Sequence, residues 1–168
     1  MAKRKKSAIA KYGKFVLVFI SIVVVAMAFL PAVKYTNGDT VYTGWEVAFG
    51  KTLSNVSFGS TTLGNATIDF SILAVIAIFL SLVGSVVFGF VISNRQIAGL
   101  FVFICFAGAA VLFFLMPQIT KVTTEVAILG SSTSTFADLK YGLGIGSILG
   151  GAFSCVGALA SLGYAMIK

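Results

Sequence analysis

The chain has 168 residues, of which 58% are hydrophobic and 10% charged, with a mean hydropathy of +1.05 and a formal net charge of +7. Soluble domains carry about a quarter charged residues, so this composition excludes an ordinary soluble domain and predicts an all-α membrane protein. Half of the twelve basic residues lie within the first fourteen positions. A clustered tail with one interleaved aromatic residue favours a lipid surface and argues against a nucleic-acid partner.

Residues 1–14 form this basic tail, and we expect it to contact anionic lipids of the inner leaflet. Its first four basic residues are the predicted headgroup ligands: Lys3, Arg4, Lys5 and Lys6. Four transmembrane segments follow, each near the length of about 20 residues that spans a hydrocarbon core. They are residues 15–33, 70–93, 97–117 and 141–167. A cleavable signal ending at Ala26-Met27-Ala28 is an alternative for the first segment, but the apolar run continues to Val33.

Charge decides the predicted orientation. With four segments and the basic tail inside, the cytoplasmic side holds eight basic residues and no acidic residue, whereas residues 34–69 and 118–140 hold all five acidic residues. This follows the positive-inside rule. We therefore expect a multi-pass plasma-membrane protein with both termini in the cytoplasm.

The first outer segment, residues 34–69, has a β pattern. Apolar and β-favouring residues alternate with others over residues 41–49, and a second strand is expected over Leu53–Phe58. The predicted contact surface on the first strand consists of Tyr42, Trp45, Glu46 and Phe49. Trp45 suits either a recognition hot spot or an interface anchor. Asn55 and Asn65 begin glycosylation triplets, which matter only in a eukaryotic source.

The second segment carries small residues spaced by four, a pattern typical of close helix contact in membranes. They are Ala77, Ser81, Ser85 and Gly89. A tight turn at residues 94–96 leads into the third segment, which ends at Pro117. In the second outer segment, residues 118–140, we expect a strand over 119–129 that joins the first outer sheet, followed by a flexible stretch, Gly130 to Thr135.

The fourth segment has the longest row of small residues spaced by four. Its members are Gly142, Gly146, Gly150, Ser154 and Ala158. At about 100° per residue this row slopes about 160° around the helix, which predicts either a steep crossing or two successive neighbours. The matching row of the second segment makes that helix the expected nearest neighbour. The glycines do not form a phosphate loop, because the required Lys and Ser or Thr are missing.

No catalytic, cofactor-binding or metal-binding residue is predicted. The chain has no histidine, and the segments lack ionisable residues between their ends, which disfavours an enzyme or a coupled transporter. Cys105 and Cys155 are expected to be packing residues, although a bridge between neighbouring helices remains open. The predicted function is a non-enzymatic tetraspan protein that contacts itself or another membrane protein; the alternative is a small oligomeric channel or facilitator.

This layout resembles the claudin-like tetraspan proteins. The resemblance rests on four segments, both ends inside, a longer β-forming first outer loop, a tight inner link and a shorter second outer loop with one strand. Gly44-Trp45 echoes the family's Gly-Leu-Trp motif, but the outer cysteine pair of that family is absent. The resemblance implies a four-helix bundle with a small extracellular β-sheet, built from the two outer loops and used for contacts between proteins.

Overall fold

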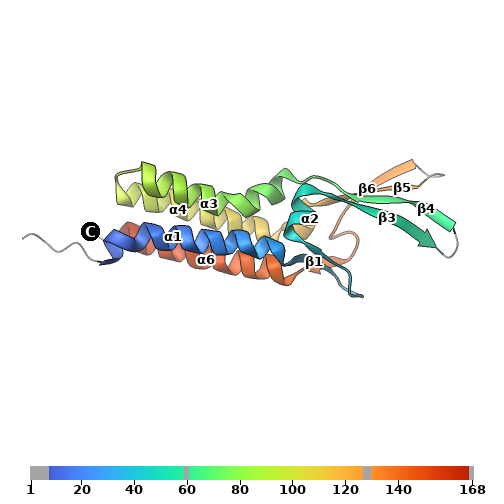
Figure 1. Ribbon diagram of the computed structural model, residues 1–168, viewed down its shortest axis with the longest axis horizontal. Coiled ribbons are helices and arrows are strands. Elements are labelled where there is room, and N and C mark those ends of the chain that lie inside the picture. The colour runs from blue at the N-terminus through green and yellow to red at the C-terminus, as the bar shows by residue number, and fades with distance from the viewer. Residues whose placement is uncertain (1–7, 59–60, 127–129, 167–168) are drawn as a thin grey trace, which may run out of the picture.

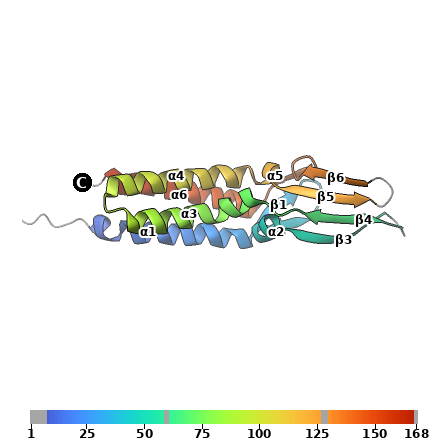
Figure 2. The ribbon, with the colours of Figure 1, turned by 90° about the horizontal axis from the view of Figure 1, so that it is seen from above.

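The computed structural model describes residues 8–58, 61–126 and 130–166. Four long helices form a bundle, and small antiparallel sheets extend from one end of it, which we call the sheet end (Figures 1 and 2). These helices are α1 (Ala8–Ala26), α3 (Ile72–Val91), α4 (Arg95–Phe114) and α6 (Ile145–Met166). All four, α1 together with the short 3-10 helix that follows it, are long and apolar enough to cross a membrane. By length and composition, the described chain therefore has four candidate membrane-spanning helices, the number expected for the predicted multi-pass membrane protein.

Each long helix packs against two others. α1 lies beside α3 and α6, and α4 also lies beside α3 and α6, so α3 and α6 occupy opposite corners of the bundle. The prediction that the second and fourth segments are nearest neighbours is wrong. The glycines of α6 receive phenylalanine rings of α4: a Cβ added to Gly150 would lie 2.8 Å from Phe113, and one added to Gly157 would lie 2.5 Å from Phe106.

The bounds of the first and fourth long helices differ from those predicted: α1 begins at Ala8, inside the predicted basic tail, and ends before its apolar run does, and α6 begins after its own run begins. After α1 comes the 3-10 helix η1 (Met27–Phe29), and Pro31 then begins strand β1 (Pro31–Tyr35) instead of extending the helix. Proline lacks a backbone donor and disfavours helical geometry in the preceding residue, and Leu30 is indeed extended. The fourth helix begins at Ile145 and not at Tyr141, because residues 141–143 form strand β7.

The smaller sheet joins segments that are far apart in the sequence. β1 pairs with β2 (Val41–Thr43) on one side and with β7 (Tyr141–Leu143) on the other, in the order β2-β1-β7. Lys140, with a φ of 61°, turns the chain into β7. This sheet therefore ties the end of the first long helix to the start of the last.

The larger sheet has four antiparallel strands in the order β3-β4-β5-β6. The strands are β3 (Lys51–Phe58), β4 (Thr61–Ile68), β5 (Lys121–Val126) and β6 (Gly130–Thr135). Strand β6 replaces the flexible stretch that the serine and threonine content had indicated. Threonine favours strands, and β6 pairs with β5 without a break from Thr135 to Gly130.

The predicted strand over residues 41–49 is also wrong. Only Val41–Thr43 is a strand, and Gly44–Phe49 is helix α2. The Thr43 hydroxyl accepts a hydrogen bond from the Glu46 amide, and the Glu46 carboxylate accepts one from the Thr43 amide. This capping box starts a helix where the alternation of residues had indicated a strand. Another short helix, α5 (Met116–Ile119), follows α4 and leads into β5.

The buried core runs without interruption from the bundle into the sheet end. Within the bundle it is filled by Leu17, Val24, Ile78, Val102, Phe106 and Phe113. At the sheet end it continues through Val47, Ile68, Val122 and Phe136. The base of the four-stranded sheet is therefore fixed to the bundle on one of its faces.

Candidate contact surfaces

The predicted small row of α6 is divided among different environments. Gly142 lies in β7, and a Cβ added there would meet nothing within 4 Å. A Cβ at Gly146 would lie 2.8 Å from the carbonyl oxygen of Leu30, whereas one at Gly150 would face α4. Ser154 and Ala158 are buried. The helical members of the row thus face two different neighbours, both within the same chain.

The row on α3 faces α1 and the bundle interior. Ala77, Ser81 and Ser85 are buried, and the Ser85 hydroxyl donates to the Ser21 hydroxyl of α1 at 2.8 Å. Ser21 in turn donates to the carbonyl oxygen of Val18 at 2.7 Å. This chain of bonds satisfies both hydroxyls and links the two helices. The last member of the row, Gly89, has open space around its Cβ position.

A close contact between α3 and α4 involves a glycine outside the predicted rows. A Cβ added to Gly84 would lie 2.4 Å from the Cβ of Cys105 and 2.6 Å from its Sγ. The two helices therefore approach where Gly84 meets Cys105. The predicted row of small residues spaced by four includes Ser85 and therefore passes over Gly84, which lies one position before it. Cys105 is buried and Cys155 exposed, and both are free thiols.

The four-stranded sheet presents one face of polar residues, which we call the polar face. Thr52, Thr67, Thr123 and Thr133 occupy one register row across all four strands. The Thr123 hydroxyl donates to an oxygen of Asp69 at 2.8 Å and lies 3.2 Å from the Thr133 hydroxyl. Lys121, Glu125 and Ser131 extend the same face and are exposed. Sequence reasoning missed this face, which could have been found from the alternation of residues 121–125.

The opposite face of the sheet is apolar at its base. Ala66, Ile68 and Val122 lie on it and are buried. Successive residues of a strand point to opposite faces, so the burial of these residues leaves the polar face directed outward. The sheet therefore offers a surface of hydroxyl and charged groups at one end of an apolar bundle.

The predicted contact residues lie elsewhere and are largely used inside the fold. The Tyr42 ring packs 5.6 Å from Phe136 and 5.9 Å from Tyr141, measured between ring centroids. Burial, followed by a hydrogen bond to Tyr42, raises the pKa of Tyr141 to about 12. Glu46 caps α2 and pairs with Lys51, whose hydrogen bond lowers the pKa of the Glu46 carboxyl.

The other two predicted contact residues, Trp45 and Phe49, belong to a series of aromatic rings along α2. Their ring centroids are 5.0 Å apart, and the Trp45 ring is also 5.5 Å from that of Phe29. Phe49 is half exposed, whereas the indole nitrogen of Trp45 is covered and has no acceptor among the described residues. Trp45 therefore packs against its neighbours rather than standing free as a recognition residue.

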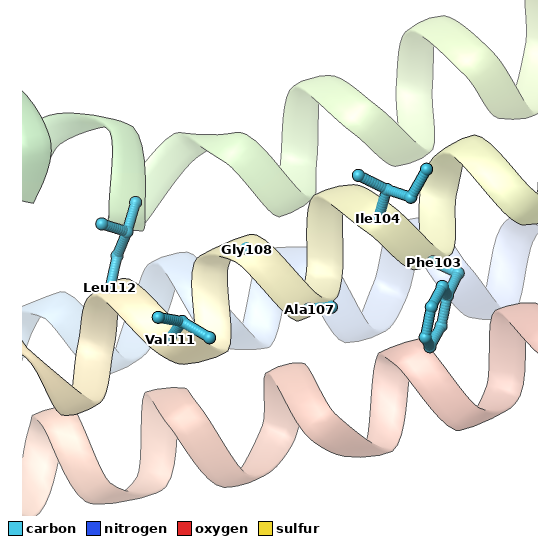
Figure 3. A pocket seen from close by; sticks show the side chains of 6 residues that line it. All are labelled: Phe103, Ile104, Ala107, Gly108, Val111 and Leu112. Atoms are coloured by element: carbon cyan, nitrogen blue, oxygen red, sulfur yellow. The ribbon is translucent and has the colours of Figure 1, made fainter.

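A shallow depression of about 490 Å³ lies on the outward side of α4 (Figure 3). It is lined by Phe103, Ile104, Ala107, Gly108, Val111 and Leu112. None of these side chains carries a polar group that would orient a ligand, so this surface fits hydrocarbon and not a specific small molecule.

The described part of the chain brings no cluster of metal-ligating side chains together. Among residues 8–58, 61–126 and 130–166, no group of three His, Cys, Asp or Glu side chains is placed to hold a metal ion. The predicted headgroup ligands Lys3, Arg4, Lys5 and Lys6 lie outside the described residues.

No protein-family model, curated protein or solved structure matches the chain. The resemblance to the claudin-like proteins therefore rests on the arrangement of the segments alone.

Proposed function

We propose that this chain is a non-enzymatic tetraspan protein of the plasma membrane that contacts a second copy of itself or another membrane protein through the four-stranded sheet at its sheet end. The observation that carries the proposal is the polar face of the four-stranded sheet, which extends beyond the apolar bundle (Figure 2). A sheet with hydroxyl and charged side chains on one face and a free edge at β6 is suited to pairing with another protein.

The orientation belongs to this proposal. Lys14 and Arg95 lie at the end of the bundle opposite the sheets, whereas Glu46, Asp69 and Glu125 lie at the sheet end. By the positive-inside rule, the sheets are outside the cell, and the tail of residues 1–14 meets anionic lipids of the inner leaflet. A contact through outer sheets is also what the resemblance to the claudin-like proteins implies.

No specific observation favours the channel alternative. Ser81, Ser85, Ser147 and Ser154 are buried inside the packed bundle. The same bundle core is filled by large buried side chains such as Phe106 and Phe113, which supports a packed bundle over a path through one chain. An oligomeric pore would have to use other residues.

Cysteine crosslinking in native membranes tests the contact. In a variant without its own thiols (Cys105→Ala, Cys155→Ala), Thr133→Cys places one thiol on the exposed edge strand β6. A bifunctional maleimide is expected to trap the chain with a second copy or a partner. The matched control is Asp39→Cys, which is exposed in the turn between β1 and β2. If the Thr133→Cys variant stays monomeric at the control level, the sheet does not make the proposed contact.

A further inference from the structure

We propose that helix α2 lies within the outer leaflet of the bilayer, with its aromatic side against lipid, and not in water beside the sheets. The inference rests on the membrane placement in the proposed function. The lipid-facing side of α2 belongs to a surface that we call the aromatic ledge and define as Phe29, Trp45, Phe49 and Phe70. Successive ring centroids along the ledge are 5.5, 5.0 and 6.4 Å apart.

The position of α2 relative to the bundle is fixed at both of its ends. A Cβ added to Gly44 would lie 2.9 Å from the Cα of Ala28, so only glycine lets the start of α2 sit directly on the end of the first segment. The Gly44 amide donates to the carbonyl oxygen of Leu30 at 3.3 Å, and the Ser71 amide donates to that of Ala48 at 3.1 Å. The depth of α2 is therefore set by the helices that it joins.

The contacts of Trp45 place it below the outer end of α3. The 20 residues of α3 rise about 30 Å, which matches the hydrocarbon thickness and puts Ile72 at the outer boundary. Phe79 is seven residues farther in, about 10 Å deeper. The Trp45 ring centroid is 5.9 Å from that of Phe79. Because helical side chains lean toward the N-terminus, the Phe79 ring lies nearer the boundary than its Cα, and the indole beside it lies at the level of the outer turns of α3.

The chemistry of the two sides of α2 agrees with this placement. Phe29, Phe49 and Phe70 are 66%, 49% and 61% exposed in the isolated chain, which is more aromatic surface than water favours. Aromatic side chains are enriched where hydrocarbon meets headgroups. Glu46 of α2 pairs with Lys51, the first residue of β3, so the charged side of α2 lies toward the sheets. Phe70 at the end of the ledge is followed in the chain by Ile72 and Leu73, which are also exposed apolar residues at the start of α3.

Trp45 is the only tryptophan of the chain, so its fluorescence reports this site alone. The full-length protein in phosphatidylcholine vesicles is titrated with lipids brominated at a shallow or a deep acyl position, and separately with aqueous iodide. We expect bromine to remove most of the emission, more from the shallow position than from the deep one, and iodide to remove little. Full access to iodide with no loss to either brominated lipid would overturn the proposal.

Two relocated tryptophans calibrate the result in a Trp45→Phe background. Val41→Trp, in the exposed strand β2, is expected to respond to iodide, and Phe79→Trp, within α3, to brominated lipid. If the Phe79→Trp variant is quenched by lipid and native Trp45 is not, the placement of α2 is wrong while the membrane segments stand. If neither responds to lipid, the membrane placement itself fails and the inference fails with it.

Discussion

The contact between Gly84 and Cys105 gives a quantitative test of the bundle. Alanine at an exposed helical glycine stabilises a helix by about 0.5–1 kcal/mol. In Gly84→Ala the new Cβ would lie 2.4 Å from the Cβ of Cys105, where carbon atoms prefer about 3.5–4 Å. Helices α3 and α4 must separate by about 1 Å, and overpacking of this kind costs about 1–3 kcal/mol. We expect Gly84→Ala to lower the free energy of unfolding by about 1–2 kcal/mol.

The same helix provides a matched control. Gly89 lies five residues farther along α3, and a Cβ there would meet nothing within 4 Å, so Gly89→Ala is expected to be neutral or stabilising by up to about 1 kcal/mol. Cys105→Gly removes the atoms that clash, so Gly84→Ala should cost less stability in a Cys105→Gly background than in the parent. Unfolding in mixed micelles with increasing SDS measures the parent, the three single variants and the double variant. Equal stability of the two alanine variants, or an equal cost of Gly84→Ala in both backgrounds, would refute the packing described here.

Three further predictions concern hydrogen bonds. In a double-mutant cycle, Ser85→Ala and Ser21→Ala should show a coupling free energy of about 0.6 kcal/mol. If the two losses of stability are simply additive, the hydrogen bond does not stabilise the bundle. Thr43→Ala removes the capping box, which should cost α2 about 1 kcal/mol and increase access of iodide to Trp45; unchanged access would mean that packing alone holds α2. The pKa of Tyr141 is raised to about 12 in the folded chain. The neutral phenol therefore contributes stability that is fully present below about pH 10 and is lost as the pH rises toward 12. Tyr141→Phe should flatten this pH dependence of the free energy of unfolding.

Hydropathy was sufficient to predict four long apolar helices, because length and the absence of charge are properties of each segment taken alone. It could not predict their order in the bundle. The sequence reasoning assumed that small residues face small residues, but Gly150 and Gly157 face the rings of Phe113 and Phe106. A glycine leaves a depression that a large side chain fills as well as a neighbouring backbone does, so the row alone does not identify its partner.

At the sheet end, local signals competed. The alternation over residues 41–49 fits a strand, yet the Thr43 and Glu46 side chains satisfy the amides that begin a helix. The run from Gly130 to Thr135 has the composition of a linker, but pairing with β5 organises it as a strand. The strand therefore depends on a partner outside its own stretch, whereas the helix depends on two side chains within the stretch whose capping role the alternation does not reveal. The polar face likewise exists only because four strands from two separate segments come into register.

The pairing of β1 with β7 has a consequence for the order of assembly during synthesis. Helices α3 and α4 are joined by a short turn and can pack as soon as both have left the ribosome, whereas α1 gains its second neighbour only when α6 arrives. Until then Val33 and Lys34 lack their partners Leu143 and Gly142. The ring of four helices therefore closes last between α1 and α6. A nascent chain stopped after α4 would leave the α6-facing side of α1 uncovered, where quality-control proteins of the membrane could bind it.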